Sequence, residues 1–184
     1  MSCVSRGGSI GWGAPLRFQG AEMSSTEFLR TVALFQDLDP PSLETLTPLL
    51  QRKKFRTGQL IFREADEADA LYIVAEGQVV VSKHVLGDVE HVLTRFGPGD
   101  FFGEMGLFDL APRSASAQAE LPTVLLGLER DVFHQILANH PQMAARICYR
   151  MVTVFVQRLR ATNEQAREAV RWGLEATGYT ALES

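Results

Sequence analysis

Residues 55–81 read FRTGQLIFREADEADALYIVAEGQVVV, and the spacing of their apolar and turn-forming residues decides the fold class. Short runs rich in β-branched and aromatic residues, such as LYIVA and QVVV, alternate with the turn-forming segments TG, EADEAD and EG. β-Branched and aromatic residues favour strands, and glycine tolerates the positive φ angles of tight turns. The segment therefore predicts short antiparallel strands joined by hairpins, with EADEAD as a solvated turn.

The same pattern continues on both sides of this segment. The further runs of this kind are KKF, EHVLTRF, DFFGE, SASAQAE and TVLLGLE. Many short strands at such close spacing are typical of an antiparallel sandwich or barrel. Apolar residues then recur at helical spacing in EFLRTVALF and SLETLTPLL before the strands and in RDVFHQILAN after them. These segments predict short helices flanking the β-rich region.

A long helix is predicted from about Pro141 to Ala176, since neither glycine nor proline interrupts its interior before Gly173. Along this helix, mostly apolar or small residues recur at alternating steps of four and three, which is a heptad pattern. These residues are Cys148, Val152, Phe155, Leu159, Thr162, Ala166, Ala169 and Gly173. The pattern predicts a homodimer formed through this helix. The alternative is a helix that packs wholly on its own domain.

Composition excludes several classes of protein. The 184 residues carry a net charge of −4, which does not point to nucleic acid or an anionic membrane as a partner. There is no apolar run long enough to span a membrane and no secretory signal, so a cytoplasmic protein is expected. Two cysteines are too few for a disulfide framework.

Four parts are expected along the chain. Residues 1–24 are rich in Gly and Ser and predict a disordered tail. The β-rich region with its short helices occupies residues 25–140, the long helix residues 141–177, and a short tail residues 178–184.

Residues 102–117, FGEMGLFDLAPRSASA, combine one carboxylate and one guanidinium with apolar, small and turn-forming residues. Arg113 can bind two oxygens of a phosphate in one plane, and Gly103 lets the backbone approach a ligand closely. Glu104 can accept a hydrogen bond from a sugar hydroxyl. The segment therefore predicts a site for a phosphate next to a ribose hydroxyl. The alternative is a salt bridge between Glu104 and Arg113 that only ties the loop.

This segment closely resembles the phosphate-binding cassette of cyclic nucleotide-binding domains, whose pattern is roughly F-G-E-x-x-L, a short loop and P-R-S/T-A. The matching residues are Phe102, Gly103, Glu104, Leu107, Pro112, Arg113, Ser114 and Ala115. The resemblance covers about residues 34–164 and includes the early strands quoted above and the lead-in GPGDFFGE. It departs at Ala65, where the family usually has glycine in a hairpin turn.

The resemblance implies a fold and a ligand. The fold is mainly β with α: an antiparallel β-roll, or jelly-roll barrel, flanked by an N-terminal helical region and a long C-terminal helix. The ligand is cAMP or cGMP, with cAMP favoured by the family. In bacterial cyclic AMP receptor proteins, a Thr–Ser pair on the dimer helix contacts adenine. The matching residues here are Thr162 and Asn163, and Asn163 departs from the pattern.

Within the cassette, the resemblance implies a role for each residue. Glu104 holds the ribose 2′-hydroxyl, and Arg113 pairs with the cyclic phosphate. The amides of Gly103 and Ala115 and the hydroxyl of Ser114 assist Arg113. The implied site also includes Phe102 and Met105.

The function expected from the sequence is that of a cyclic nucleotide-binding regulatory protein without catalytic activity, which signals by rearranging its long helix toward an unknown protein partner. One alternative is a regulatory fragment of a larger enzyme, channel or transcription regulator. Another is a scaffold that no longer binds nucleotide. Only about eight residues follow Ala176, so direct DNA binding is not expected. The four histidines lack the spacing of a metal-dependent enzyme, so no metal is expected.

Overall fold

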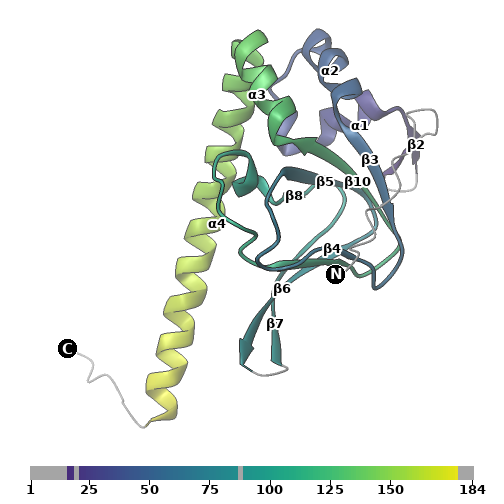
Figure 1. Ribbon diagram of the computed structural model, residues 1–184. Coiled ribbons are helices and arrows are strands. Elements are labelled where there is room, and N and C mark those ends of the chain that lie inside the picture. The colour runs from purple at the N-terminus through teal and green to yellow at the C-terminus, as the bar shows by residue number, and fades with distance from the viewer. Residues whose placement is uncertain (1–15, 19–20, 87–88, 178–184) are drawn as a thin grey trace. The chain divides into compact units, whose positions relative to one another are not determined.

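The computed structural model describes residues 16–18, 21–86 and 89–177, and its main body contains two four-stranded antiparallel sheets (Figure 1). The first sheet has the strand order β3-β10-β5-β8, with β3 (Gln51–Phe55), β10 (Thr123–Glu129), β5 (Ala70–Glu76) and β8 (Phe101–Phe102). The second has the order β4-β9-β6-β7, with β4 (Leu60–Phe62), β9 (Ser116–Ala119), β6 (Val79–Leu86) and β7 (Val89–Phe96). The expected antiparallel β-roll is confirmed.

Helices precede and follow the strands of the two sheets, as the sequence predicts, and the short helix η3 lies between β8 and β9. They are α1 (Ser25–Thr31), η1 (Ala33–Phe35), α2 (Pro40–Leu46), η2 (Thr47–Leu49), η3 (Glu104–Leu107), α3 (Arg130–Asn139) and α4 (Pro141–Ala176). Side-chain caps fix where the first helices begin. Ser24 and Glu27 form a capping box at α1, and Asp39 Oδ1 accepts a hydrogen bond of 3.0 Å from the Ser42 amide at α2.

The core lies between the inner faces of the two sheets, because alternate residues of a strand point to the same face. Ala70, Tyr72 and Val74 of β5 share one cluster with Ala117 and Ala119 of β9. Three aromatic rings join the sheets at one point. The ring centres of Phe62, Tyr72 and Phe102 lie 5.7 to 6.1 Å from one another. Because Phe102 ends β8, this aromatic cluster anchors the segment that follows it.

Two features of the fold were not expected. Strands β1 (Leu16–Phe18) and β2 (Ala21–Met23) pair within the stretch expected to be disordered, and Leu16 is fully buried. The prediction of a disordered tail is therefore wrong for these two strands. Residues 1–15 of the predicted tail lie outside the described residues. Ala65 adopts a φ of 68°, the left-handed conformation that glycine tolerates best. Alanine thus adopts this conformation at the position where the family usually has glycine.

The chain divides into two compact units between Ile147 and Cys148. The first unit contains both sheets, α1 to α3 and the first turns of α4, and the second contains the rest of α4. The helix has the predicted bounds, Pro141–Ala176. Within the part of the chain that the structure describes, no helix combines the length and the apolar character that crossing a membrane requires.

Candidate functional site

The glycine-rich turn after β8 begins the candidate site. Gly103 has a φ of 73°, a conformation that residues with a Cβ atom rarely adopt, and it turns the chain from β8 into the short helix η3. Gly106 and Leu107 are buried in this helix. A Cβ atom on Gly106 would lie 3.0 Å from the Cβ of Ala68, so the helix packs closely on the loop before β5. Glycine at both positions allows η3 to sit at this place.

Arg113 lies in the loop between η3 and β9, and its backbone is fixed by the loop between β4 and β5. Its amide donates a hydrogen bond of 2.8 Å to the Asp66 carbonyl, and its own carbonyl accepts one of 2.9 Å from the Ala65 amide. The Ala65 turn therefore holds the backbone from which the guanidinium projects. Such backbone pairing fixes a side chain more precisely than a free loop does.

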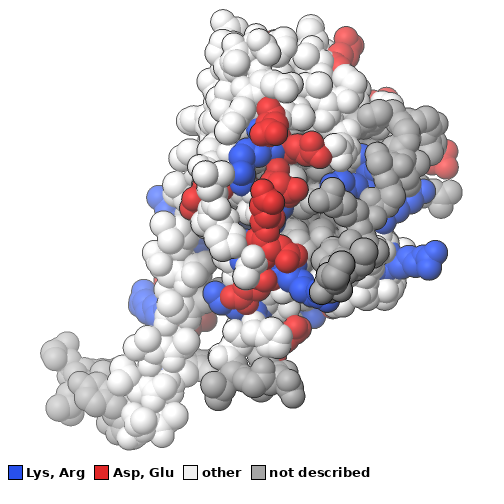
Figure 2. Space-filling view, in the orientation of Figure 1, with Lys and Arg blue, Asp and Glu red and all other residues white. Residues whose placement is uncertain are grey.

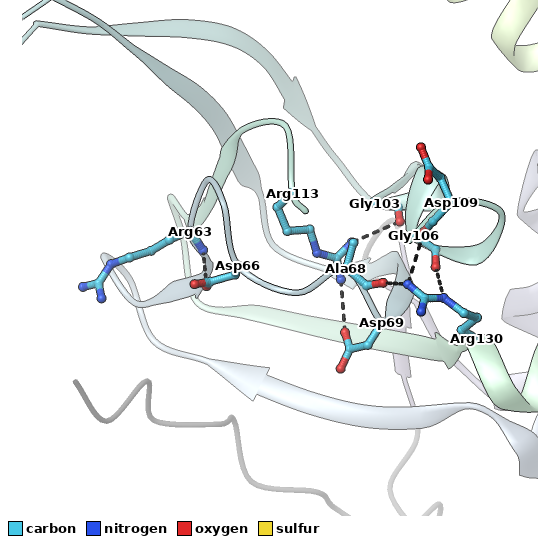
Figure 3. Close-up of polar contacts among 9 residues, drawn as sticks. All are labelled: Arg63, Asp66, Ala68, Asp69, Gly103, Gly106, Asp109, Arg113 and Arg130. Atoms are coloured by element: carbon cyan, nitrogen blue, oxygen red, sulfur yellow. Dashed lines mark hydrogen bonds and ion pairs between the residues drawn. The ribbon is translucent and has the colours of Figure 1, made fainter. Parts of the chain in front are cut away.

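The Arg113 side chain is buried, with an exposed fraction of 4%, and points back toward Gly103 (Figure 3). Its Nη1 donates to the Gly103 carbonyl at 3.1 Å, and its Nη2 donates to Oδ1 of Asp69 at 3.3 Å. The guanidinium carbon lies 4.2 Å from the centre of the Phe62 ring and 5.8 Å from that of Tyr72. The charge is thus held over aromatic faces at cation–π distance.

Burial lowers the pKa of the Arg113 guanidinium, and the positive charge of Arg130 adds to this lowering, while Tyr72 and Asp69 oppose it. The side chain stays cationic at neutral pH, because an arginine titrates far above that range. Its buried Nε has no hydrogen-bond partner among the described residues. A buried donor without a partner costs about 1–3 kcal/mol. The geometry therefore leaves one donor of a buried cation available to an anionic acceptor.

The other residues predicted in the cassette flank Gly103 and Arg113 in the chain. Glu104 is half-buried in the first turn of η3, next to the carbonyl that Arg113 binds. Ala115 is buried and Ser114 is exposed, two residues and one residue after Arg113. The structure thus brings both ends of the predicted cassette together through Gly103 and Arg113.

Two predicted residues at the start of the cassette differ in exposure. Phe102 is buried in the aromatic cluster, so its side chain is part of the core directly before Gly103. Met105 is largely exposed, with an exposed fraction of 59%. The Met105 side chain therefore adds apolar surface beside η3.

Sequence reasoning missed the acidic partner of Arg113. The alternative expectation was a salt bridge between Glu104 and Arg113, but the carboxylate that pairs with Arg113 belongs to Asp69. Asp69 lies in EADEAD, which was interpreted as a solvated turn, and its side chain is 65% exposed. The one signal in the sequence for a role of Asp69 was its position directly before β5, because a strand fixes the position of the residue next to its end.

Thr162 and Asn163 lie on α4 in the second unit, and both are exposed. The Thr162 hydroxyl donates to the Arg158 carbonyl at 3.0 Å, a bond within the helix. Contact of these residues with a nucleotide base stays a prediction. Among the described residues, no group of three or more His, Cys, Asp or Glu side chains is arranged to hold a metal ion.

Charge on the surface constrains how an anion is held. Figure 2 shows Asp and Glu side chains in a band down the face in view, with Lys and Arg beside the band and not in a broad basic patch. The net charge of the chain is −4. The face in view therefore carries no broad basic patch that would attract a phosphate.

Comparison with known proteins places these features in context. Residues 52–140 match the family model described as the cyclic nucleotide-binding domain. The chain is 31% identical over 144 residues to the CRP-like cAMP-activated global transcriptional regulator of Mycobacterium tuberculosis, covering 78% of this chain and 62% of that protein. It is 34% identical over 149 residues to the cyclic AMP receptor protein of Thermus thermophilus, covering 77% of this chain and 67% of that protein.

A solved structure has the same fold. It is a cyclic nucleotide-binding domain from Methylobacillus flagellatus, with a TM-score of 0.70 and 25% identity, covering 77% of this chain and 83% of that one. The chain thus matches a domain over most of its length, and it spans 62% of the length of the mycobacterial regulator.

Proposed function

Because this chain belongs to the cyclic nucleotide-binding domain family, we propose that it is a regulatory protein, not an enzyme, that binds cAMP, or cGMP with lower preference. The observation that carries this proposal is the buried Arg113 guanidinium, which is held at the Gly103 carbonyl and whose Nε has no partner in the described part of the chain. A cyclic phosphate carries one negative charge and two free oxygens. One buried cation therefore matches this phosphate better than a patch of surface charges would.

The phosphate would bind at Nε and at the donors near it. The Ser114 hydroxyl and the Ala115 amide follow Arg113 directly in the chain, and the Gly103 amide lies at the other end of the cassette. Asp69 already supplies a carboxylate to Nη2, but the buried Nε has no acceptor among the described residues. A ligand phosphate would provide the missing acceptor and relieve the cost of the buried donor.

Glu104 would select the sugar. Its carboxylate is half-buried one residue from the carbonyl that holds Arg113, so a group bound to both residues needs an anion and a hydroxyl close together. The 2′-hydroxyl of a cyclic ribonucleotide lies beside its cyclic phosphate ring. A carboxylate accepts from such a hydroxyl in a charge-assisted hydrogen bond.

The output of the protein would involve α4. We expect Thr162 and Asn163 to contact the base and the helix to change its arrangement when the ligand binds. A homodimer through α4 is supported by the heptad pattern and by exposed apolar residues on the helix, including Val152 at 58% and Leu159 at 61% exposure. The partner that reads this change would be another cytoplasmic protein.

The domain boundaries remain part of this proposal. Residues 25–140 would form the nucleotide-binding part, and residues 141–177 the helix that dimerises. A second candidate function is that of the regulatory part of a longer protein, which is favoured because the chain spans 62% of the length of the mycobacterial regulator.

Calorimetric titration of the purified chain with cAMP, cGMP, cyclic di-GMP and linear 5′-AMP tests the proposal. We expect saturable binding of cAMP and weaker binding of cGMP. We expect no saturable binding of 5′-AMP, because its phosphate carries a second negative charge and is not closed into a ring. The absence of binding by any cyclic nucleotide would mean that the chain keeps the fold as a scaffold.

A further inference from the structure

One side of α4 carries all the charged residues of its distal part, residues 159–176, where every residue is exposed. These charged residues are Arg160, Glu164, Arg167, Glu168, Arg171 and Glu175. None of them occupies the heptad pattern or its two flanking rows, residues 156, 163 and 170 on one side and 158, 165 and 172 on the other. The ion pairs within the helix are Arg167 with Glu164 at 3.6 Å and Arg171 with Glu175 at 3.8 Å. This side of the helix therefore suits contact with water and not with another helix.

The opposite side of the distal helix is neutral. It includes Val170 at 63% and Trp172 at 70% exposure, beside the small residues of the heptad pattern. A row of exposed apolar residues of this kind marks an interaction surface. Since no charge lies on this side, two copies of it can meet without bringing like charges together. A second copy of this chain is therefore a partner that fits the surface.

The size of the heptad residues changes along the helix. Those between residues 152 and 159 are large, and those between residues 166 and 173 are alanine or glycine. In a parallel pair in register, Phe155 would face Phe155 and Gly173 would face Gly173. The distance between helix axes, about 8–10 Å, follows the side chains at the contact. A parallel pair would therefore be wide at one end and narrow at the other, or would leave the small end poorly packed.

An antiparallel pair removes this mismatch. When the two helices cross at residue 164 of each copy, every layer joins a larger residue of one copy to a small residue of the other, which is how well-packed layers fill space. Ala176 continues the heptad pattern and takes part in the outermost layer. The layers are Val152 with Ala176, Phe155 with Gly173, Leu159 with Ala169, and Thr162 with Ala166. The two halves of one helix are thus complementary to each other in size.

The flanking rows match in the same arrangement. Val156 of one copy faces Val170 of the other, and Arg158 faces Trp172. Arg158 is the one charged residue among residues 156, 158, 163, 165, 170 and 172, and a guanidinium over an indole ring makes a favourable cation–π contact. In a parallel pair, Arg158 would lie beside Asn163 instead. The antiparallel pair therefore gives both flanks a chemically matched contact.

We propose that two copies of this chain pair through α4 in antiparallel orientation, centred near residue 164, with Trp172 of each copy packed on Arg158 of the other. The N-termini of the two helices then lie at opposite ends of the pair. This orientation rests on the homodimer of the proposed function, and nucleotide binding does not enter the argument for it.

Disulfide cross-linking of the full chain tests the orientation. Leu159→Cys and Ala169→Cys are made separately in a Cys3→Ser, Cys148→Ser background, and the two proteins are mixed, equilibrated and oxidised. We expect a disulfide only between unlike chains, because residue 159 faces residue 169 while two copies of either residue lie about 15 Å apart along the axis. Mass spectrometry identifies the linked residues. Disulfides between like chains would show a parallel dimer, which would overturn this proposal and leave the homodimer in place.

A spin label at Glu175 gives a second measurement that leaves the heptad pattern intact. In the same background, Glu175→Cys is labelled and the distance between the labels of the two copies is measured by pulsed electron paramagnetic resonance. Antiparallel helices separate these labels by about 33 Å along the axis, whereas parallel helices hold them within about 20 Å. If Leu159→Cys abolishes the dimer, this distance decides the orientation, and a distance of about 20 Å or less contradicts the proposal.

Sedimentation equilibrium tests the contact between Arg158 and Trp172. We expect Arg158→Gln to weaken the dimer by about threefold to thirtyfold, and to have little further effect when combined with Trp172→Ala. Arg160→Gln is the control, because it removes a charge from the side of the helix that faces water and should leave the dimer unchanged. Independent, additive effects of Arg158→Gln and Trp172→Ala would overturn the contact.

The two proposals fail in different ways. A monomeric wild-type chain would overturn this orientation together with the homodimer, while calorimetry with cAMP would still decide nucleotide binding. An antiparallel dimer that binds no cyclic nucleotide would support this inference and remove nucleotide binding from the proposed function.

Discussion

A Cβ atom on Gly103 would lie 2.8 Å from Nη1 of Arg113, closer than real Cβ atoms approach their neighbours. The first residue of the turn after β8 therefore determines where the guanidinium rests. The same Gly103 supplies the carbonyl that accepts the Nη1 hydrogen bond at 3.1 Å. Any side chain at this position would press on the group that we propose binds the phosphate.

Substituting Gly103 by alanine should separate backbone strain from displacement of Arg113. Gly58 is a matched control, because its φ of 75° is close to the 73° of Gly103 and no atom lies within 4 Å of the position of its Cβ. Both variants should lose roughly 1–2 kcal/mol of stability from the left-handed backbone. In calorimetry, Gly103→Ala should bind cAMP more weakly than the wild-type chain by a factor of more than about ten, whereas Gly58→Ala should not. Equal affinities of the two variants would show that Gly103 does not control Arg113.

Phe62 should contribute to binding through its ring. The Arg113 guanidinium carbon lies 4.2 Å from the ring centre, a geometry worth about 1–2 kcal/mol when desolvated. Phe62→Leu should therefore weaken cAMP binding by about fivefold to thirtyfold. Phe55→Leu is the control, because Phe55 is buried in the same core cluster. Both variants should unfold at similar denaturant concentrations, and equal loss of affinity in both would contradict a specific role for the Phe62 ring.

Glu104 is expected to distinguish ribose from deoxyribose. The wild-type chain should prefer cAMP over 2′-deoxy-cAMP by about tenfold or more, which is the value of one charge-assisted hydrogen bond. In Glu104→Gln the preference should shrink, because a neutral amide oxygen is a weaker acceptor than a carboxylate. Glu120→Gln changes a carboxylate that pairs with Arg95 on β7 and should keep the preference. An unchanged preference in Glu104→Gln would remove the sugar contact from the proposal.

The heptad pattern of α4 makes a prediction about assembly. Leu159 belongs to the pattern and is 61% exposed, so Leu159→Glu should place a charge in the interface of a dimer. Light scattering should then report a dimer for the wild-type chain and a monomer for this variant. Gln157→Glu adds the same charge at an exposed position of the helix that lies outside the pattern and should remain dimeric. A monomeric wild-type chain would contradict the proposed dimer through α4.

Much of the fold follows from local patterns in the sequence. The alternation in the β-rich region predicts the strands, and the absence of proline and glycine from Gln142 to Trp172 predicts the long helix α4, which spans Pro141–Ala176. The spacing of Gly103, Glu104 and Arg113 predicts one cluster, because a turn and a short helix return the chain toward its start. These are short-range properties, and periodicity or turn chemistry expresses them directly.

The contacts that complete the cluster could not be predicted in this way. Asp69 reaches Arg113 across 44 residues, and Arg130 reaches Ala68 across 62. Such contacts depend on how the sheets bring loops together, which no local pattern records. The pairing of β1 with β2 was missed for a different reason, since the Gly- and Ser-rich composition of residues 1–24 outweighed the signal of the six residues that pair in Leu16–Phe18 and Ala21–Met23.

The most direct test of the central claim is calorimetric titration of cAMP into the wild-type chain and into Arg113→Gln, with Arg95→Gln as the control. Arg95 also pairs with a carboxylate, that of Glu120 at 2.9 Å, but it is half exposed and lies on β7. The wild-type and control proteins should bind one cAMP per chain with similar affinity, and Arg113→Gln should bind at least about a hundredfold more weakly, the loss expected for an unmatched phosphate charge. Equal binding by Arg113→Gln and the wild-type chain would contradict the account.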